Sequence, residues 1–320
     1  MTLFDENSFP PPDREPPSDS PAQPGVDASQ PSATPSEPPL AGDPISLAAA
    51  VSAPALPYNA SAALPEDLRI SWSWLHLAVF LGFVMVSFFV VQIGFMVYYA
   101  APLRHLSTEK EFERFALSKP AFAVGSMVLL YALVLLFLYV SLSVLPGSPF
   151  WRTLGWRKLT RPNGGRRRSP WVFFFAGCGL SVLVFIVTAK MQPPEDVPIE
   201  ELFHYKNTAL LFMAMAVLVA PLVEETVFRG YLYPLFAKYF GVAASVLVTG
   251  VLFGLMHGAQ LGWTWSLVSV LITVGVIFTF VRARTGSVFS SFLLHLGYNS
   301  TIALVTVLGL LGFPKTPPGH

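Results

Sequence analysis

Beyond residue 70 the chain is a succession of long apolar runs separated by short polar stretches. A helix needs about 20 apolar residues to cross the hydrocarbon layer of a bilayer. Helices are the spanning structure for such runs, because lipid offers the backbone no hydrogen-bonding partner. The pattern predicts an all-α, polytopic transmembrane helix bundle with about seven spans, at 74–99, 120–145, 171–190, 208–228, 242–260, 262–281 and 286–311.

The segment 1–70 follows another pattern. It holds fifteen of the 29 prolines, mixed with Ser, Ala and Asp, and no basic stretch leads into an apolar one. Such a composition cannot bury enough apolar surface to offset the entropy of ordering the chain. We therefore expect a disordered, Pro-rich acidic tail at 1–70, a transmembrane helical domain at 71–320, and no cleavable signal peptide.

Composition agrees with a membrane protein. Of the 320 residues, 53% are hydrophobic and 12% are charged, whereas a soluble domain carries about 25% charged residues. The formal net charge of +1 combines an acidic tail with a basic remainder and says nothing about partners. Cys178 is the single cysteine, which excludes a disulfide framework within the chain, and we interpret it as a packing or lipid-facing residue.

The distribution of charged residues between the spans predicts the topology. Seven basic residues and no acidic ones lie between residues 151 and 170, and a second short basic turn lies at 282–285. The positive-inside rule places both in the cytoplasm, together with the tail. The loops at 100–119 and 191–207 then fall outside. We expect the protein in the cytoplasmic membrane of a bacterium.

Few ionisable residues interrupt the apolar runs of the second half of the chain. A charged group at bilayer depth costs about 2.5–3.5 kcal/mol on insertion scales, so such residues are functional candidates. The candidates are five ionisable residues (two carboxylates, two histidines and one arginine) and one polar asparagine, on three predicted helices. They are Glu224, Glu225, Arg229, His257, His295 and Asn299.

Helical spacing separates the roles of the two glutamates. Glu225 and Arg229 are at positions i and i+4 and share a helix face, with the acid in the better order for pairing. Glu224 points about 100° away from Glu225 around the helix. We infer that Glu225 neutralises Arg229 and that Glu224 faces a polar cavity, where a carboxylate suits general acid or base chemistry. His295 and Asn299 have the same spacing, so they can lie side by side.

Each candidate also has a purely structural interpretation. The Glu225–Arg229 pair alone could be an ion pair that only stabilises the bundle, and each histidine or Asn299 alone could hydrogen-bond neighbouring helices. For Phe253 a packing role is favoured over a role in the site. The coincidence of all these polar groups on three helices favours a hydrolytic site.

Three motifs carry a resemblance to a known family. Glu224-Glu225-Thr226-Val227-Phe228-Arg229 is similar to an EExxxR motif, Phe253-Gly254-Leu255-Met256-His257 to FxxxH, and His295-Leu296-Gly297-Tyr298-Asn299 to HxxxN. In this order they are typical of the CPBP intramembrane proteases, the CAAX prenyl protease and bacteriocin-processing (ABI) family. The resemblance covers residues 170–311, which we take as the catalytic core.

The resemblance implies a peptidase site inside the membrane. Glu224 and His257 would activate a water molecule, and His295 and Asn299 would stabilise the oxyanion. Glu225, Arg229 and Phe253 would support the site or contact the substrate. The implied partners are membrane lipid and a prenylated or otherwise membrane-anchored peptide or protein, and no nucleic acid is expected.

A metal-dependent form of the same reaction stays open. Glu224, His257 and His295 could supply a zinc ion with two imidazoles and a carboxylate. The chain lacks the HExxH helix of soluble zinc proteases, and Glu225 would then have to act as base while compensating Arg229. We therefore favour a glutamate-dependent reaction without a metal cofactor.

Two functions of another class are also consistent with a helical bundle. A non-catalytic scaffold or bacteriocin-immunity protein would keep the fold, although intact motifs argue against it. A secondary transporter also places charged residues inside the membrane, but the first half of the chain shows no repeat of the 208–311 pattern.

The predicted spans leave one geometric conflict. If the span 208–228 runs inward, Glu224 lies near the cytoplasmic boundary. His257 would lie about 22 Å deeper at 1.5 Å per helical residue. The segment 228–240 must then bend or re-enter for the two residues to meet.

Overall fold

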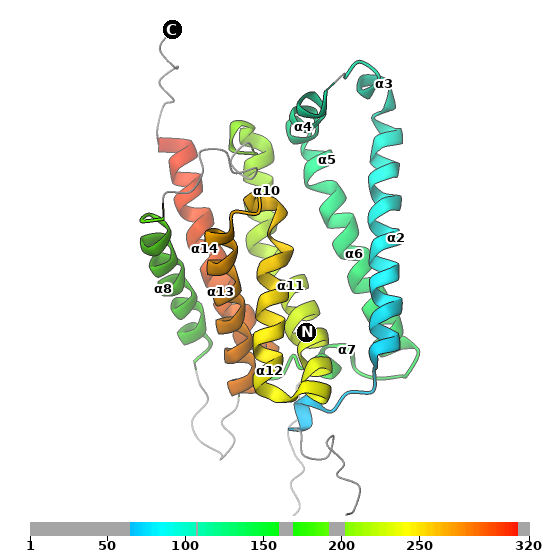
Figure 1. The fold of residues 1–320 in the computed structure, drawn as a ribbon, viewed down its shortest axis with the longest axis vertical. Helices are drawn as coiled ribbons and strands as arrows, with labels where there is room; N and C mark the ends of the chain where they lie inside the picture. The colour runs from blue at the N-terminus through cyan, green and yellow to red at the C-terminus, as the bar shows by residue number, and fades with distance from the viewer. Residues whose placement is uncertain (1–64, 107, 160–168, 192–201, 313–320) are drawn as a thin grey trace, which may run out of the picture. The chain divides into compact units, whose positions relative to one another are not determined.

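The computed structural model describes residues 65–106, 108–159, 169–191 and 202–312. Within these ranges the regular structure is helical and no strand occurs. Six helical stretches in the described part of the chain are long and apolar enough to cross a membrane. The chain is therefore a multi-pass membrane protein with an all-α fold (Figure 1), as the hydrophobic pattern predicts. The prediction for residues 1–64 lies outside the described residues.

Five of the six stretches agree closely with predicted spans at both ends. They contain α2 (Trp74–Tyr98), α5 with α6 (Pro120–Ala123 and Gly125–Tyr139) and the π-helical η2 (Val140–Val144), α8 (Pro170–Thr188), α13 (Trp265–Thr285) and α14 (Val288–Gly312). Shorter elements lie between them: η1 (Glu66–Leu68), α3 (Ala100–Leu103), α4 (Glu109–Ser118), α7 (Phe150–Thr153), η3 (Leu202–His204) and η5 (Ala259–Leu261).

The remaining stretch, Lys206–Met256, is 51 residues long and contains two of the predicted spans. It runs through α10 (Lys206–Leu218), α11 (Ala220–Glu225), the π-helical η4 (Thr226–Leu232) and α12 (Tyr233–Met256). Gly241 interrupts α12 with φ 77° and ψ 166°, a conformation that glycine adopts because it has no Cβ. The ribbon of α12 turns back on itself at its lower end in Figure 1, and Gly241 is the residue of α12 with non-helical dihedral angles.

The reversal at Gly241 corrects the predicted end of the fourth span. The first arm is helical beyond residue 228 and continues to the break at Gly241. In the sequence, Glu224 lies about as far before Gly241 as His257 lies after it. Since the two arms run in opposite directions, the two residues reach a similar height in the bundle. The rings of Phe228 and Phe253, from the two arms, are 5.3 Å apart. The reversal at Gly241 thus supplies the bend that the predicted spans required, and it comes later than residue 228.

Small residues bring the second arm of α12 close to α13. Gly250 and Gly254 are one helical turn apart, and a Cβ at either would lie 2.6 Å from a backbone nitrogen of α13, that of Val276 or Ile272 respectively. Close approach of this kind is typical of small residues at i and i+4 in membrane helices. The packing fixes the arm that carries Phe253 and His257.

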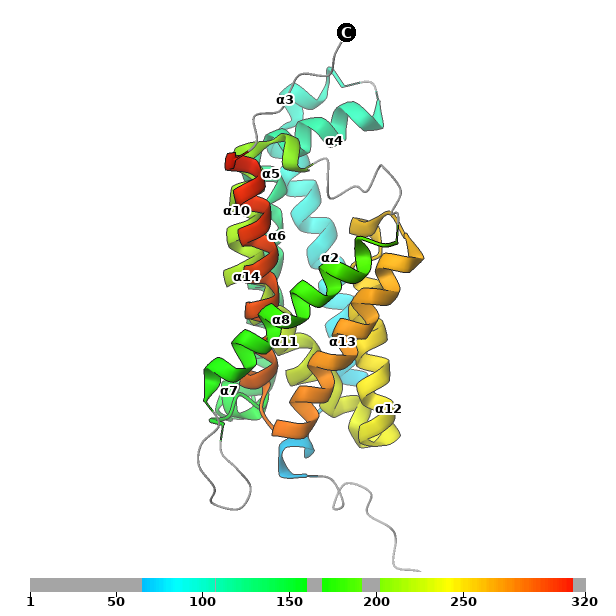
Figure 2. The same cartoon turned by 90° about the vertical axis from the view of Figure 1, so that its left-hand side faces the viewer.

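The helix α8 packs obliquely across α14, which carries the third motif (Figure 2). The thiol of Cys178 on α8 lies 3.5 Å from the carbonyl oxygen of Gly297 on α14. Cys178 is half-buried and thus serves in helix packing.

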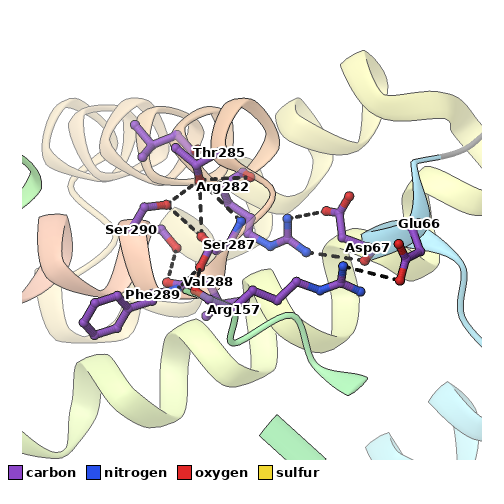
Figure 3. Close-up of polar contacts among 11 residues, drawn as sticks. Glu66, Asp67, Arg157, Arg282, Thr285, Ser287, Val288, Phe289 and Ser290 are labelled. Carbon is purple, nitrogen blue, oxygen red and sulfur yellow. Dashed lines mark hydrogen bonds and ion pairs between the residues drawn. The ribbon is translucent and has the colours of Figure 1, made fainter. Parts of the chain in front are cut away.

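Three segments that the charge pattern assigns to the same membrane side meet at one end of the bundle (Figure 3). Arg282 at the end of α13 donates to the Asp67 carboxylate of η1 at 2.6 Å, and the Val288 amide donates to the Gly155 carbonyl at 2.9 Å. Leu68, which the composition assigned to the tail, is 2% exposed. The last residues before α2 are therefore part of the folded bundle.

Candidate active site

A cavity of about 280 Å³ lies between α6, α8, α10, α11, α12, α13 and α14. Its lining is mostly apolar, with side chains such as Met127, Phe212 and Leu271. Four of the six polar candidates, together with Phe253, are exposed to this cavity: Glu224, His257, His295 and Asn299. The structure thus gathers side chains from all three motifs around one space, although the motifs are far apart in the sequence.

Glu225 and Arg229 form a sealed ion pair beside the cavity. Arg229 Nη1 lies 2.9 Å from Glu225 Oε1, and both side chains are 0% exposed. The guanidinium also donates to Thr279 Oγ1 at 3.2 Å and to the Gly275 carbonyl at 2.9 Å, both on α13. A buried charge is tolerated when it is paired and hydrogen-bonded in this way. Arg229 therefore ties η4 to α13.

Glu224 occupies a different environment, one residue earlier on α11. Its side chain is 16% exposed and lines the cavity. Oε1 accepts a hydrogen bond from the Tyr131 hydroxyl at 3.2 Å, and Oε2 lies 3.8 Å from His295 Nε2. The angular separation of adjacent helical residues thus directs one carboxylate toward Arg229 and the other into the cavity.

The partners of the two histidines define how their rings face the cavity. His257 Nδ1 lies 2.8 Å from the Phe253 carbonyl oxygen. A carbonyl only accepts, so Nδ1 carries the proton and Nε2 of a neutral His257 has a free lone pair. His295 Nδ1 lies 3.0 Å from Glu225 Oε1 and its Nε2 points toward Glu224. Each ring is therefore oriented through Nδ1.

Asn299 and Phe253 complete the surroundings of the histidines. Asn299 Nδ2 donates to the Ala216 carbonyl at 2.8 Å, which connects α14 to α10. The second N–H of the amide is then available to another acceptor. Phe253 is 2% exposed. Its ring centroid lies 4.4 Å from the Arg229 guanidinium carbon and 4.8 Å from the His257 ring centroid, so it packs between site residues.

Sequence reasoning missed several partners in the site. The carbonyl groups of Phe253, Ala216 and Gly275 accept hydrogen bonds from site residues, and a backbone carbonyl has no residue-type signal. Tyr131 lies in the apolar run of α6, outside every motif. Its one visible signal is a hydroxyl in the middle of a transmembrane span, where a buried phenol generally finds a partner.

The zinc ligands allowed by the sequence were Glu224, His257 and His295. Over the described ranges, no group of three or more His, Cys, Asp or Glu side chains lies in a position to hold a metal ion. Each imidazole has an Nε2 directed away from its own anchor, and the metal-free reaction stays a prediction.

One comparison with known proteins gives a match. Residues 206–301 match the family model of the type II CAAX prenyl endopeptidases, Rce1-like. The match extends from α10 through Asn299 and contains all six polar candidates. Searches of curated proteins and of solved structures gave no match. The resemblance drawn from the three motifs is therefore confirmed, and the family points to a protease.

Proposed function

We propose that this protein is an intramembrane endopeptidase that hydrolyses a peptide bond of a membrane-associated substrate with a water molecule activated by Glu224 and His257. The observation that carries the proposal is the contrast between the two adjacent glutamates. Glu225 is sealed against Arg229, whereas Glu224 lines a cavity that also contains His257, His295 and Asn299. The family match to residues 206–301 supports the same class of reaction.

Glu224 takes the role of general base. A water molecule in the cavity gives one proton to Glu224 while its oxygen forms a bond to the carbonyl carbon of the substrate. The lone pair on His257 Nε2 accepts the other hydrogen of the water and orients it. The tetrahedral intermediate then breaks its C–N bond, and the proton held by Glu224 passes to the departing amine.

His295 and Asn299 take the role of the oxyanion hole. Two carboxylates flank His295: Glu225 lies 3.0 Å from Nδ1, and Glu224 lies 3.8 Å from Nε2. In this role the ring donates from Nδ1 to Glu225 and from Nε2 to the oxyanion. The free N–H of Asn299 lies one helical turn away and adds a second donor. A preorganised donor of this kind contributes on the order of 10²–10³ in rate.

The substrate class follows from the cavity and the family. Apolar side chains make up most of the lining, which suits a chain that enters from the lipid phase. The matched family acts as CAAX prenyl endopeptidases, so we propose a prenylated or otherwise lipid-anchored peptide cleaved near its C-terminus. The proposed location is the cytoplasmic membrane, with the N-terminal tail on the cytoplasmic side. No step of the proposed reaction uses a metal.

Quantitative mass spectrometry of C-terminal peptides tests the function. Membranes from cells that produce the wild-type protein are compared with membranes that contain equal amounts of Glu224→Gln protein. We expect substrates that are shortened at the C-terminus only with the wild type. Identical C-terminal peptides in both membranes would contradict the proposal and favour a non-catalytic scaffold.

A further inference from the structure

The hydroxyl group that contacts the proposed base comes from outside the matched segment. Tyr131 on α6 donates to Glu224 Oε1 at 3.2 Å and lines the same cavity. We propose that Tyr131 is a positioning residue, which holds the Glu224 carboxylate in the orientation that accepts the proton of water. The inference rests on the function proposed above.

Glu224 needs such a partner because its carboxylate can rotate. The last torsion of a glutamate side chain, which joins tetrahedral and planar carbon atoms, has a broad and shallow preference. The residue at i+4 is Phe228, so the helix itself supplies no cation to hold the carboxylate. The Tyr131 hydroxyl occupies Oε1, and Oε2 is left facing His295 Nε2 at 3.8 Å. The two oxygens therefore have distinct positions before substrate enters.

Tyr131 is itself held by the packing of α6. Its ring packs against the core that contains Leu138, Phe80 and Tyr231, and α6 is anchored to α2 by contacts such as that between Phe83 and Phe137, whose ring centroids are 4.8 Å apart. Met127, one helical turn before Tyr131, also lines the cavity. One face of α6 thus forms a wall of the site, and the first half of the chain completes the catalytic core.

Replacement by phenylalanine isolates the hydroxyl, because Tyr131→Phe keeps the ring in the cavity wall. A hydrogen bond to a charged group corresponds to a change of about 10- to 100-fold in an equilibrium or a rate. With a farnesylated CAAX peptide as the probe, we expect Tyr131→Phe to lower kcat by about that factor and to change KM less than about twofold. Tyr139→Phe on the same helix, where the ring is 48% exposed, is the matched control and keeps the wild-type kcat.

Measuring Tyr131→Phe in the Glu224→Gln protein as well separates a positioning role of Tyr131 from a general stabilisation of the fold. If Tyr131 acts through Glu224, Tyr131→Phe has no further effect on the residual rate of Glu224→Gln, because the group it positions is gone. A hydroxyl that only stabilises the fold would lower the rate by the same factor in both backgrounds. Equal losses in the two backgrounds would overturn the proposal.

Infrared difference spectroscopy of the purified proteins checks the contact without any substrate. The carboxyl band that disappears in Glu224→Gln is expected to shift in Tyr131→Phe and to stay in place in Tyr139→Phe. An unshifted band, or a wild-type kcat in Tyr131→Phe, would overturn the inference while leaving the proposed function intact. A wild-type protein that cleaves nothing would overturn the proposed function, and the inference with it.

Discussion

Replacing Glu225 by glutamine tests whether the sealed ion pair holds the site together. Glutamine keeps the size of the side chain and removes the charge that compensates Arg229, whose side chain is 0% exposed. The guanidinium keeps its hydrogen bonds to Thr279 and Gly275 and its position over the Phe253 ring. The loss is therefore mainly one of charge compensation. Breaking one side of a buried pair costs about 3–5 kcal/mol.

Thermal unfolding in detergent measures this cost. We expect the melting temperature of Glu225→Gln to fall by on the order of 10 °C, with a parallel loss of activity because His295 loses its ionised partner. Glu224→Gln is the matched control, since Glu224 is 16% exposed in the cavity and lies outside the ion pair with Arg229.

A double variant shows whether Arg229 is the cause. Glu225→Gln with Arg229→Met removes the uncompensated charge and is expected to melt above Glu225→Gln alone. A Glu225→Gln protein that melts like the wild type would refute the reasoning, and so would a double variant that is less stable than the single one.

Three further predictions concern the rest of the chain. Asp67→Asn leaves the buried Arg282 without its carboxylate partner. We expect it to lower the free energy of unfolding by about 1–3 kcal/mol, measured by thermal melting. Glu66→Gln is the control, because Glu66 is 74% exposed, and it should lower that free energy by no more than about 1 kcal/mol. A cysteine at Lys158, in a Cys178→Ala background, should react with impermeant maleimide only from the cytoplasmic side, and labelling from outside would invert the topology. Cleavage is expected to persist in phenanthroline, with less than about one equivalent of zinc bound; zinc lost and regained together with activity would contradict the glutamate-dependent reaction.

The hydrophobic pattern predicted the spans because bilayer thickness dictates the length of each apolar run. It placed the end of the fourth span too early, since Pro234 and Lys238 interrupt the apolar run after residue 228. Pro234 lies just after the π-helical η4, and the helix continues through it as far as Gly241. The actual reversal depends on Gly241, whose positive φ no hydropathy window can detect.

Residue types and helical phase predicted the site candidates but not their contacts. The i to i+4 spacing was enough to pair Glu225 with Arg229, because both lie on one helix. The contacts of Tyr131 with Glu224 and of Asn299 with Ala216 join different helices. They depend on which helices become neighbours, and this is decided by packing such as that of Gly250 and Gly254 against α13.

The cleavage rate of purified Glu224→Gln protein tests the central claim most directly. Wild-type and variant proteins in detergent are incubated with a farnesylated CAAX peptide, and the released C-terminal fragment is quantified. Because glutamine keeps the shape of the side chain and cannot accept the proton of water, turnover should fall by about 10²–10⁴ at an unchanged melting temperature. Near-normal turnover of Glu224→Gln, or a well-folded but inactive Glu225→Gln beside an active Glu224→Gln, would contradict the assignment of Glu224 as the base.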